Sequence, residues 1–274
     1  MLLMPRLVLY GASAALVLSA SLAAQSVSGN PQHLPAEAGP CDSLPSDIPH
    51  DEALRGVCHY AVTVPLRMPN FTCQQETSRL LRGAHEQTDT ITGVVTYEDG
   101  RESYQDLKRN GQPVDSIAPL RGAWSAGQFG SNLQSIFDGR NKVEFHFAGE
   151  KKIKGRQAWE FTYRIAHQEV PLWQLRVQNE VVAPPYYGKL WIDQRAGLIL
   201  RLEMEASEIP WSFPIRTAKL EIDYENVLFA DGTRFVLPVK SELHSSESNG
   251  IFARNIQRFQ SCRKFRGTAR IVPW

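Results

Sequence analysis

Residues 186–206 read YYGKLWIDQRAGLILRLEMEA, and this stretch decides the fold. It predicts two strands joined by a tight turn, because apolar and charged residues alternate through its second half. The residues expected on the apolar face are Leu198, Leu200, Leu202 and Met204, and those expected on the charged face are Arg201, Glu203 and Glu205. Alternation of this length is typical of a half-buried antiparallel strand. The segment therefore predicts an architecture, and it carries no catalytic chemistry.

The first strand of this segment is apolar on both faces. Trp191 stands between Leu190 and Ile192, and successive side chains along a strand point to opposite faces. We therefore expect this strand to lie between the core and a covering helix.

The rest of the chain is also dominated by period-two patterns, and helical spacing is confined to residues 51–64 and 129–137. The other expected strands are 71–81, 88–98, 101–108, 143–147, 159–165, 172–179, 220–225, 235–243 and 250–265. Strands joined by short turns pair antiparallel, and a sheet of this size must curl, split or be covered. The sequence predicts a mainly β (α+β) fold: a strongly curved antiparallel sheet or unclosed β-barrel of about eleven strands, covered by two or so helices.

The N-terminus predicts an export signal. Arg6 precedes an apolar run over 7–22, and residues 21–23 fit a small-x-small cleavage site. A membrane anchor is the alternative, but the run of about 16 residues is shorter than the roughly 20 that a span needs. The expected organisation is a signal peptide at 1–23, a flexible lead-in at 24–48, a single curved-sheet domain at 49–266 and a C-terminal tail at 267–274. We therefore expect a periplasmic or secreted protein.

The charge balance excludes one class of partner. The chain has 30 basic and 29 acidic residues, and loss of the signal removes Arg6 and no acid, so the mature chain has 29 of each. A net charge of zero argues against a large basic surface. We expect no nucleic-acid partner.

Four cysteines indicate two disulfides. They are Cys41, Cys58, Cys73 and Cys262, an even number in a chain expected to be exported, and they allow three connectivities. We favour Cys41–Cys58, which closes a short loop at the first helix, and Cys73–Cys262, which joins the first strand to the last. A metal site is the alternative, but the sequence has no C-x-x-C pair to support it.

Catalytic motifs are missing from the sequence. Residues 122–127 come nearest to a nucleophile elbow but have the wrong spacing, and His85-Glu86 lacks the second histidine of a zinc hydrolase. A phosphate-binding loop is also missing. We therefore expect no catalytic residue, no metal and no cofactor, and a protein that is not an enzyme.

Aromatic side chains are the remaining candidates for a binding role. Those expected to line an apolar cavity under the helices are Phe145, Phe147, Trp159, Phe161, Tyr163 and Trp191. An ordinary core is the alternative, because burying one such side chain is worth roughly 1.5–3 kcal/mol to folding without any ligand.

The segment 188–193, its turn and the following leucine-rich strand resemble the periplasmic lipoprotein-carrier, or outer-membrane lipoprotein-sorting, superfamily. The order of elements is also similar: signal, helix, meandering strands, a helical insert and more strands. The resemblance implies an unclosed β-barrel capped by helices, with an apolar cavity between them. A group of exported bacterial proteins without an assigned activity is similar in the segments 68–74, 127–131, 136–138 and 213–216.

These features together favour a non-enzymatic exported protein that binds a hydrophobic ligand, either a lipid or an acylated lipoprotein, between sheet and helices. Peripheral contact with envelope membranes is compatible with that role. The first alternative is an envelope interaction or sensor module with a filled core and no cargo. An unrecognised hydrolase is the second alternative.

Overall fold

The computed structural model describes residues 39, 41–116, 123–124, 127–177 and 180–265. The chain divides into two units, Met1–Glu37 and Ala38–Trp274, and every described residue belongs to the second. The predicted signal peptide and the predicted tail at 267–274 lie outside the described residues. The domain boundaries expected from the sequence stay predictions.

The described residues form two helices and thirteen strands. The helices are α1 (Asp51–Arg67) and α2 (Ser131–Phe137). The strands are β1 (Phe71–Arg82), β2 (Glu86–Glu98), β3 (Arg101–Arg109), β4 (Gln112–Pro113), β5 (Val143–Ile153), β6 (Arg156–Ile165), β7 (Leu175–Val177), β8 (Glu180–Val182), β9 (Tyr186–Asp193), β10 (Ile199–Ala206), β11 (Ile215–Leu228), β12 (Arg234–Glu247) and β13 (Phe252–Lys264).

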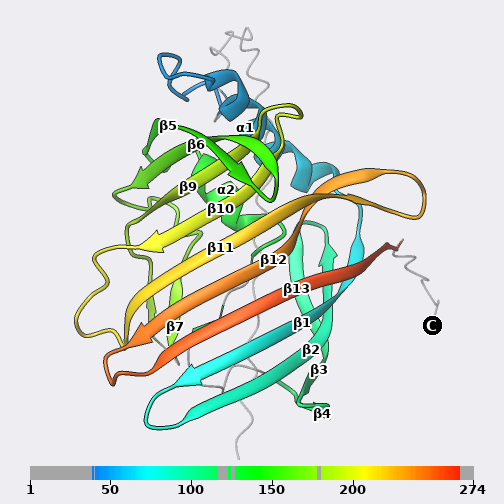
Figure 1. The fold of residues 1–274 in the computed structure, drawn as a ribbon, viewed down its shortest axis with the longest axis vertical. Coiled ribbons are helices and arrows are strands. Elements are labelled where there is room, and N and C mark those ends of the chain that lie inside the picture. Colours follow the sequence, from blue (N-terminus) through cyan, green and yellow to red (C-terminus); the bar gives the residue numbers. More distant parts are fainter. Residues whose placement is uncertain (1–38, 40, 117–122, 125–126, 178–179, 266–274) are drawn as a thin grey trace, which may run out of the picture. The chain divides into compact units, whose positions relative to one another are not determined.

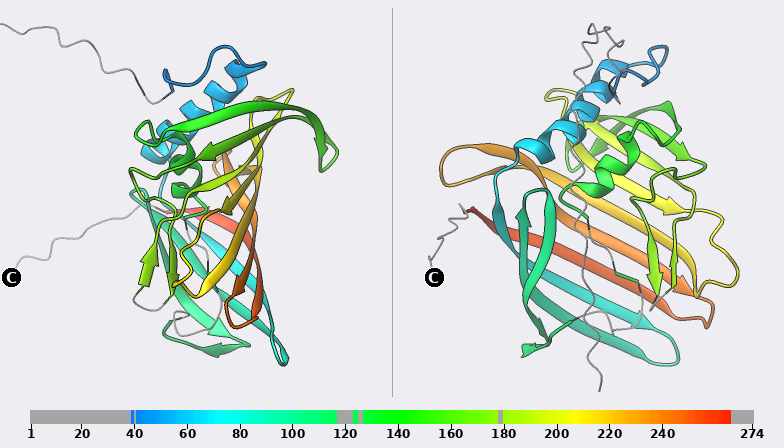
Figure 2. Two further views of the ribbon diagram at one scale, coloured as in Figure 1. Left: turned by 90° about the vertical axis from the view of Figure 1, so that its left-hand side faces the viewer. Right: turned by 180° about the vertical axis from the view of Figure 1, so that it is seen from behind.

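Eleven of these strands form one antiparallel sheet in the order β4-β3-β2-β1-β13-β12-β11-β10-β9-β6-β5. The sheet is strongly twisted and curved, and its edge strands β4 and β5 do not pair with each other (Figures 1 and 2). β7 and β8 make a separate two-stranded sheet. The predicted fold class, a curved and unclosed antiparallel sheet with helical cover, is confirmed.

Helices α1 and α2 cover one face of the sheet, which we call the inner face (Figure 2). Leu54, Val57 and Ala61 of α1 and Leu133 and Ile136 of α2 belong to the same buried cluster as the inner residues of β5, β6 and β9–β12. Residues three and four apart lie on one side of a helix. The helical residues in this cluster are therefore the apolar stripes that the helical spacing predicts.

A β-bulge in residues 186–206 places Leu200 on the opposite face from the one expected. Ile199 pairs with Ile192 and Arg201 pairs with Trp191, so Leu200 is the extra residue between them. Leu200 is buried with Trp191 and Ala158 in a small cluster separate from the main core, whereas Ile199 joins the main core. The prediction that Leu200 shares a face with Leu202 is therefore wrong.

Polar residues line the inner face where β1, β12 and β13 meet. Gln75, Thr77, Arg79, Asn255 and Gln257 are all at most 7 % exposed. The Arg79 guanidinium pairs with Asp89 on β2 at 2.8 Å, and both side chains are buried. This part of the inner face is held by hydrogen bonds and charge, and apolar packing is confined to the remainder.

Two disulfides join distant parts of the chain, with the pairing favoured from the sequence. Cys41 is bonded to Cys58, and Cys73 to Cys262. Arg55 of α1 also donates hydrogen bonds to the backbone carbonyls of Cys41 and Leu44. The described end of the predicted lead-in is thereby fastened to α1.

Candidate ligand-binding cleft

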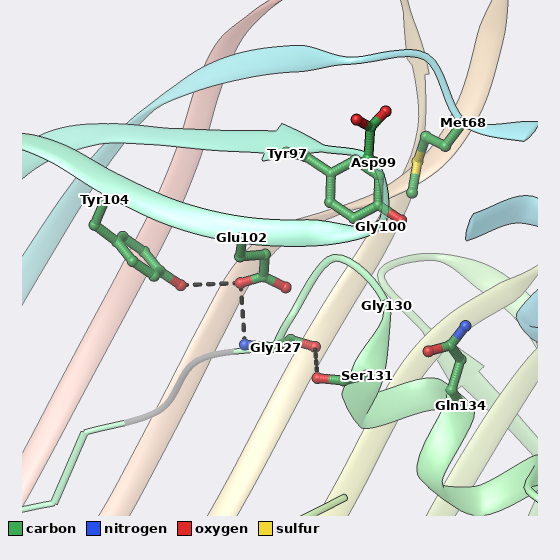
Figure 3. Close-up of a pocket in the computed structure, with 10 residues that line it drawn as sticks. All are labelled: Met68, Tyr97, Asp99, Gly100, Glu102, Tyr104, Gly127, Gly130, Ser131 and Gln134. Carbon is green, nitrogen blue, oxygen red and sulfur yellow. Dashed lines mark hydrogen bonds between the residues drawn. The ribbon is translucent and has the colours of Figure 1, made fainter. Parts of the chain in front are cut away.

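A cleft of about 620 Å³ lies between the β2–β3 turn and the start of α2 (Figure 3). Its lining residues are Met68, Tyr97, Asp99, Gly100, Glu102, Tyr104, Gly127, Gly130, Ser131 and Gln134. Three separate stretches of sequence meet here: the connection from α1 to β1, the β2–β3 hairpin, and the loop that leads into α2.

The β2–β3 hairpin positions one wall of the cleft. Its turn residues Asp99 and Gly100 both have positive φ, at 48° and 79°, which suits the tight turn that Asp-Gly predicts. The register places Tyr97 opposite Glu102. The Asn70 side-chain carbonyl accepts a hydrogen bond from the Asp99 backbone N–H at 3.0 Å, so the residues that precede β1 are tied to this turn.

Glu102 fixes the opposite wall to the hairpin. Its carboxylate accepts hydrogen bonds from the backbone N–H groups of Gly127 at 3.0 Å and Phe129 at 2.9 Å, and the Tyr104 hydroxyl donates a third at 3.0 Å. Burial raises the pKa of Glu102 although these three donors oppose the rise. Burial likewise raises the pKa of Tyr104, and the neighbouring Glu102 charge raises it further. Because the carboxylate is occupied by donors of the protein itself, its role here is structural.

Apolar side chains form the floor of the cleft. Met68 and Tyr97 belong to a second buried cluster, in which the rings of Phe71 and Tyr97 stack with centroids 5.2 Å apart. Phe129 packs edge-on against Phe71 at 5.4 Å. Glu102, Ser131 and Gln134 lie around this floor, so the cleft has an apolar base and polar sides.

A much smaller space, about 20 Å³, continues from the cleft beneath the two helices. Met68 and Gly130 line both spaces. The deeper space also contacts Tyr60 and Leu133 on the helices and Tyr224 on the sheet. At this volume the side chains that line this deeper space are packed nearly as closely as an ordinary core.

The other side of α2 borders a second concavity of about 580 Å³. Gln134 and Phe137 of α2, Val62 of α1 and Leu172 are among its lining residues. Gln134 lines both large concavities, so α2 forms the wall between them.

The structure places the six aromatic candidates in the sheet rather than around this cleft. Phe145, Phe161 and Tyr163 are at most 4 % exposed in the main core, and Phe147 and Trp159 are partly buried against it. Trp191 lies on the opposite, outer face, where its indole N–H donates to Glu160 at 2.9 Å. Their role as ligand contacts stays a prediction. Trp191 cannot contact a ligand beneath the helices from that face.

Sequence reasoning missed the residues that line the cleft. The Asp99-Gly100 turn and the residues before β1 are each recognisable, but their contact depends on the pairing of β1 with β2 across Tyr97 and Phe71. In the sequence, Glu102 is one of several charged residues in the expected strand 101–108, and nothing there marks it as buried. Its partners, Gly127 and Phe129, are 25 and 27 residues away.

Within the described ranges, no group of three or more His, Cys, Asp or Glu side chains is arranged to hold a metal ion. Neither described helix has the length and hydrophobicity of a membrane span.

No protein-family model matches the chain, and no curated protein matches it. Among solved structures, the chain is similar to a LolA superfamily protein from Nitrosomonas europaea, at 11 % identity over 78 % of this chain and 94 % of that one, with a TM-score of 0.35. It is similar to a putative outer membrane lipoprotein-sorting protein domain from Vibrio parahaemolyticus, at 12 % identity over 73 % and 87 %, with a TM-score of 0.36. A DUF1329 family protein from Desulfovibrio piger matches at 12 % identity over 79 % and 95 %, with a TM-score of 0.39.

Two of these similar structures carry the name of the superfamily that the sequence resembles.

Proposed function

We propose that this protein is an exported, non-enzymatic binding protein for an amphiphile, a molecule with an apolar acyl chain and a polar head. The observation that carries the proposal is the 620 Å³ cleft, whose apolar floor adjoins the space beneath the helices at Met68 and Gly130. Small-molecule sites in proteins are concavities of about 300–1,000 Å³ with apolar walls and a few polar groups.

The lining of the cleft fits such a molecule. An acyl chain would lie against Met68 and Tyr97, and a polar head would face Ser131 and Gln134. Free lipids and acylated lipoproteins share this chemistry, so the cleft alone favours neither source. The two disulfides are compatible with export, because disulfides persist in oxidising compartments.

The packing beneath the helices sets a condition on this proposal. The space that adjoins the cleft at Met68 and Gly130 has only about 20 Å³ open, so an acyl chain longer than the cleft enters it only if α1 and α2 move away from the sheet. The same observation favours a second candidate function, an envelope interaction or sensor module that carries no cargo. Binding of an apolar probe separates the two.

The test is titration of the purified protein with cis-parinaric acid, a fatty acid whose fluorescence rises in apolar sites. We expect saturable binding that Met68→Glu weakens about tenfold or more, because a charge replaces a buried apolar contact. Leu228→Glu is the matched control, since the same charge is placed at a side chain that is 55 % exposed.

Gln134→Trp is a second variant that narrows the cleft from a partly exposed helix position. It guards against the case in which Met68→Glu fails to fold. Absence of saturable binding, or equal affinity in Gln134→Trp and the unsubstituted protein, would overturn the proposal and favour the cargo-free module.

A further inference from the structure

The loop between β10 and β11 presents one side chain to solvent more fully than any other large apolar residue in the described part of the chain. Trp211 is 87 % exposed, whereas Leu172, Val181, Tyr187 and Leu228 are 36–55 % exposed. The loop lies at the end of the sheet where the β12–β13 turn also lies (Figure 1). Single exposed apolar side chains are common on protein surfaces, and what distinguishes Trp211 is its rigid support and its cationic neighbour.

The loop is firmly held at its base. Phe213, two residues after Trp211, is 1 % exposed and packs in the main core. The Ser207 N–H donates to the Pro185 carbonyl and the Ser248 N–H donates to the Pro214 carbonyl, both at 2.8 Å. These contacts attach the loop to the chain before β9 and to the β12–β13 turn. The exposed ring therefore projects from a fixed support.

Arg216 clamps the tip of the loop. Its guanidinium carbon lies 5.1 Å from the centre of the Trp211 ring, a cation–π contact. The same guanidinium donates hydrogen bonds to the carbonyls of Trp211, at 2.8 Å, and Phe213. None of the ion pairs among the described residues involves Arg216, so its positive charge lies beside the indole without a carboxylate partner.

Part of the backbone at the tip is hydrogen-bonded within the protein. The carbonyls of Pro210, Trp211, Phe213 and Pro214 all accept hydrogen bonds from within the protein. Pro210 and Pro214 have no N–H, and the Phe213 N–H donates to Pro210 at 2.9 Å. Unsatisfied backbone groups are the main cost of placing a loop in a weakly polar medium. These internal hydrogen bonds lower the cost of bringing the loop into such a medium.

We propose that the Trp211 loop docks the protein on a phospholipid surface, with the indole at the level of the headgroups and Arg216 facing their phosphates. Trp is the side chain that favours the membrane–water interface, since its ring is apolar and its N–H is polar. A protein partner fits less well. Stable protein interfaces bury about 800 Å² on each side around a dry centre. The exposed residues beside Trp211 are Glu208, Pro210 and Ser212, and they do not form an apolar patch of that size.

The docking site is separate from the cleft, so the two proposals fail independently. The test measures partition of the full chain onto vesicles of phosphatidylethanolamine and phosphatidylglycerol by flotation. We expect Trp211→Ala to lower the partition coefficient about tenfold, and Trp211→Phe to lower it less. Leu228→Ala, which removes an exposed apolar side chain at the far end of β11, is the matched control and should change nothing.

Thermal unfolding should be nearly unchanged in Trp211→Ala because the ring is exposed, and its affinity for cis-parinaric acid in solution should also be unchanged. Equal partition of Trp211→Ala and the unsubstituted protein overturns the docking proposal. The proposal is also overturned if the protein does not bind vesicles and instead forms a dimer that depends on Trp211, as detected by analytical ultracentrifugation.

Discussion

Gly188 shows how one residue lets neighbouring strands of the sheet pack tightly over the core. It lies on the inner side of β9, opposite Tyr163 of β6 and Met204 of β10. The Tyr163 hydroxyl donates to the Glu203 carbonyl at 2.7 Å directly over this position. A Cβ at residue 188 would overlap both that carbonyl oxygen and the Tyr163 hydroxyl. Glycine is therefore required for space, in a strand where it normally weakens pairing.

We predict that Gly188→Ala lowers the free energy of unfolding by about 3 kcal/mol, the upper end of the usual cost of overpacking a core. The control is Gly56→Ala on the exposed side of α1, where an added Cβ meets nothing within 4 Å. That substitution should raise the stability by about 1 kcal/mol, because Ala is the better helix former. Urea denaturation measures both. Equal effects of the two substitutions would refute the steric account.

Glu242 on β12 carries the clearest pH dependence. Its carboxylate contacts Lys240 at 2.8 Å, His244 at 2.7 Å and Arg254 at 2.7 Å. Burial raises its pKa, but these three partners outweigh burial and lower the pKa from 4.5 to about 2. Since the folded protein has the lower pKa, the stabilisation is complete above pH 4.5 and is lost as the pH falls from 4.5 to about 2.

We therefore predict that Glu242→Gln reduces the loss of stability between pH 5 and pH 2, as followed by thermal unfolding at a series of pH values. Glu98→Gln, at an exposed position at the end of β2, is the control and should leave the slope unchanged. An acid slope in Glu242→Gln as steep as in the unsubstituted protein would argue against this carboxylate as its source.

At the residue scale, the sequence predicts which side chains are buried better than it predicts the face of the sheet on which each one lies. The alternation in residues 186–206 correctly places Leu202 and Met204 in the core. Leu200 is misplaced because a bulge adds one residue, and period two cannot signal a bulge. Trp191 is correctly expected on the face opposite Leu190, but a small outer cluster buries it where a helix was expected.

At the scale of elements, β1 holds the two halves of the described sheet together. It pairs with β2 on one side and with β13 on the other, so the first strand of the chain meets the last. The Cys73–Cys262 disulfide crosses this junction with a sequence separation of 189, against 17 for Cys41–Cys58.

We predict that the double variant Cys73→Ser, Cys262→Ser loses about 5 kcal/mol of stability, and Cys41→Ser, Cys58→Ser about 3 kcal/mol, because a longer closed loop restrains the unfolded chain more. Guanidinium denaturation of both variants measures which of them loses more stability. Loss of more stability from the short loop than from the long one would contradict the prediction.

Most elements could be predicted from local pattern, since turns such as Asp99-Gly100 and Asn110-Gly111 mark where strands end. In place of the expected strand 172–179, the structure has the short strand β7. β7 pairs with β8 in a separate two-stranded sheet. Helix α1 continues to Arg67, three residues beyond the expected helical range 51–64.

At the scale of the whole described fold, the cleft and the Trp211 loop lie beside different strands of the same sheet. The cleft adjoins α1 and α2 at the β2–β3 turn, and the Trp211 loop lies between β10 and β11. A curved sheet and its helical cover could be predicted from periodicity and length. The cleft could not, because it is formed by Glu102 binding a loop 25 residues away, and local sequence gives no sign of such a contact.

The central claim is that an acyl chain occupies the cleft beside Met68. Photo-crosslinking with a diazirine-labelled fatty acid, followed by peptide mass spectrometry, tests it most directly. We predict labels on Met68, Tyr97 or residues 127–134, and loss of these labels when excess unlabelled palmitate competes. Labels confined to the outer face of the sheet, or labels that palmitate does not displace, would contradict the claim.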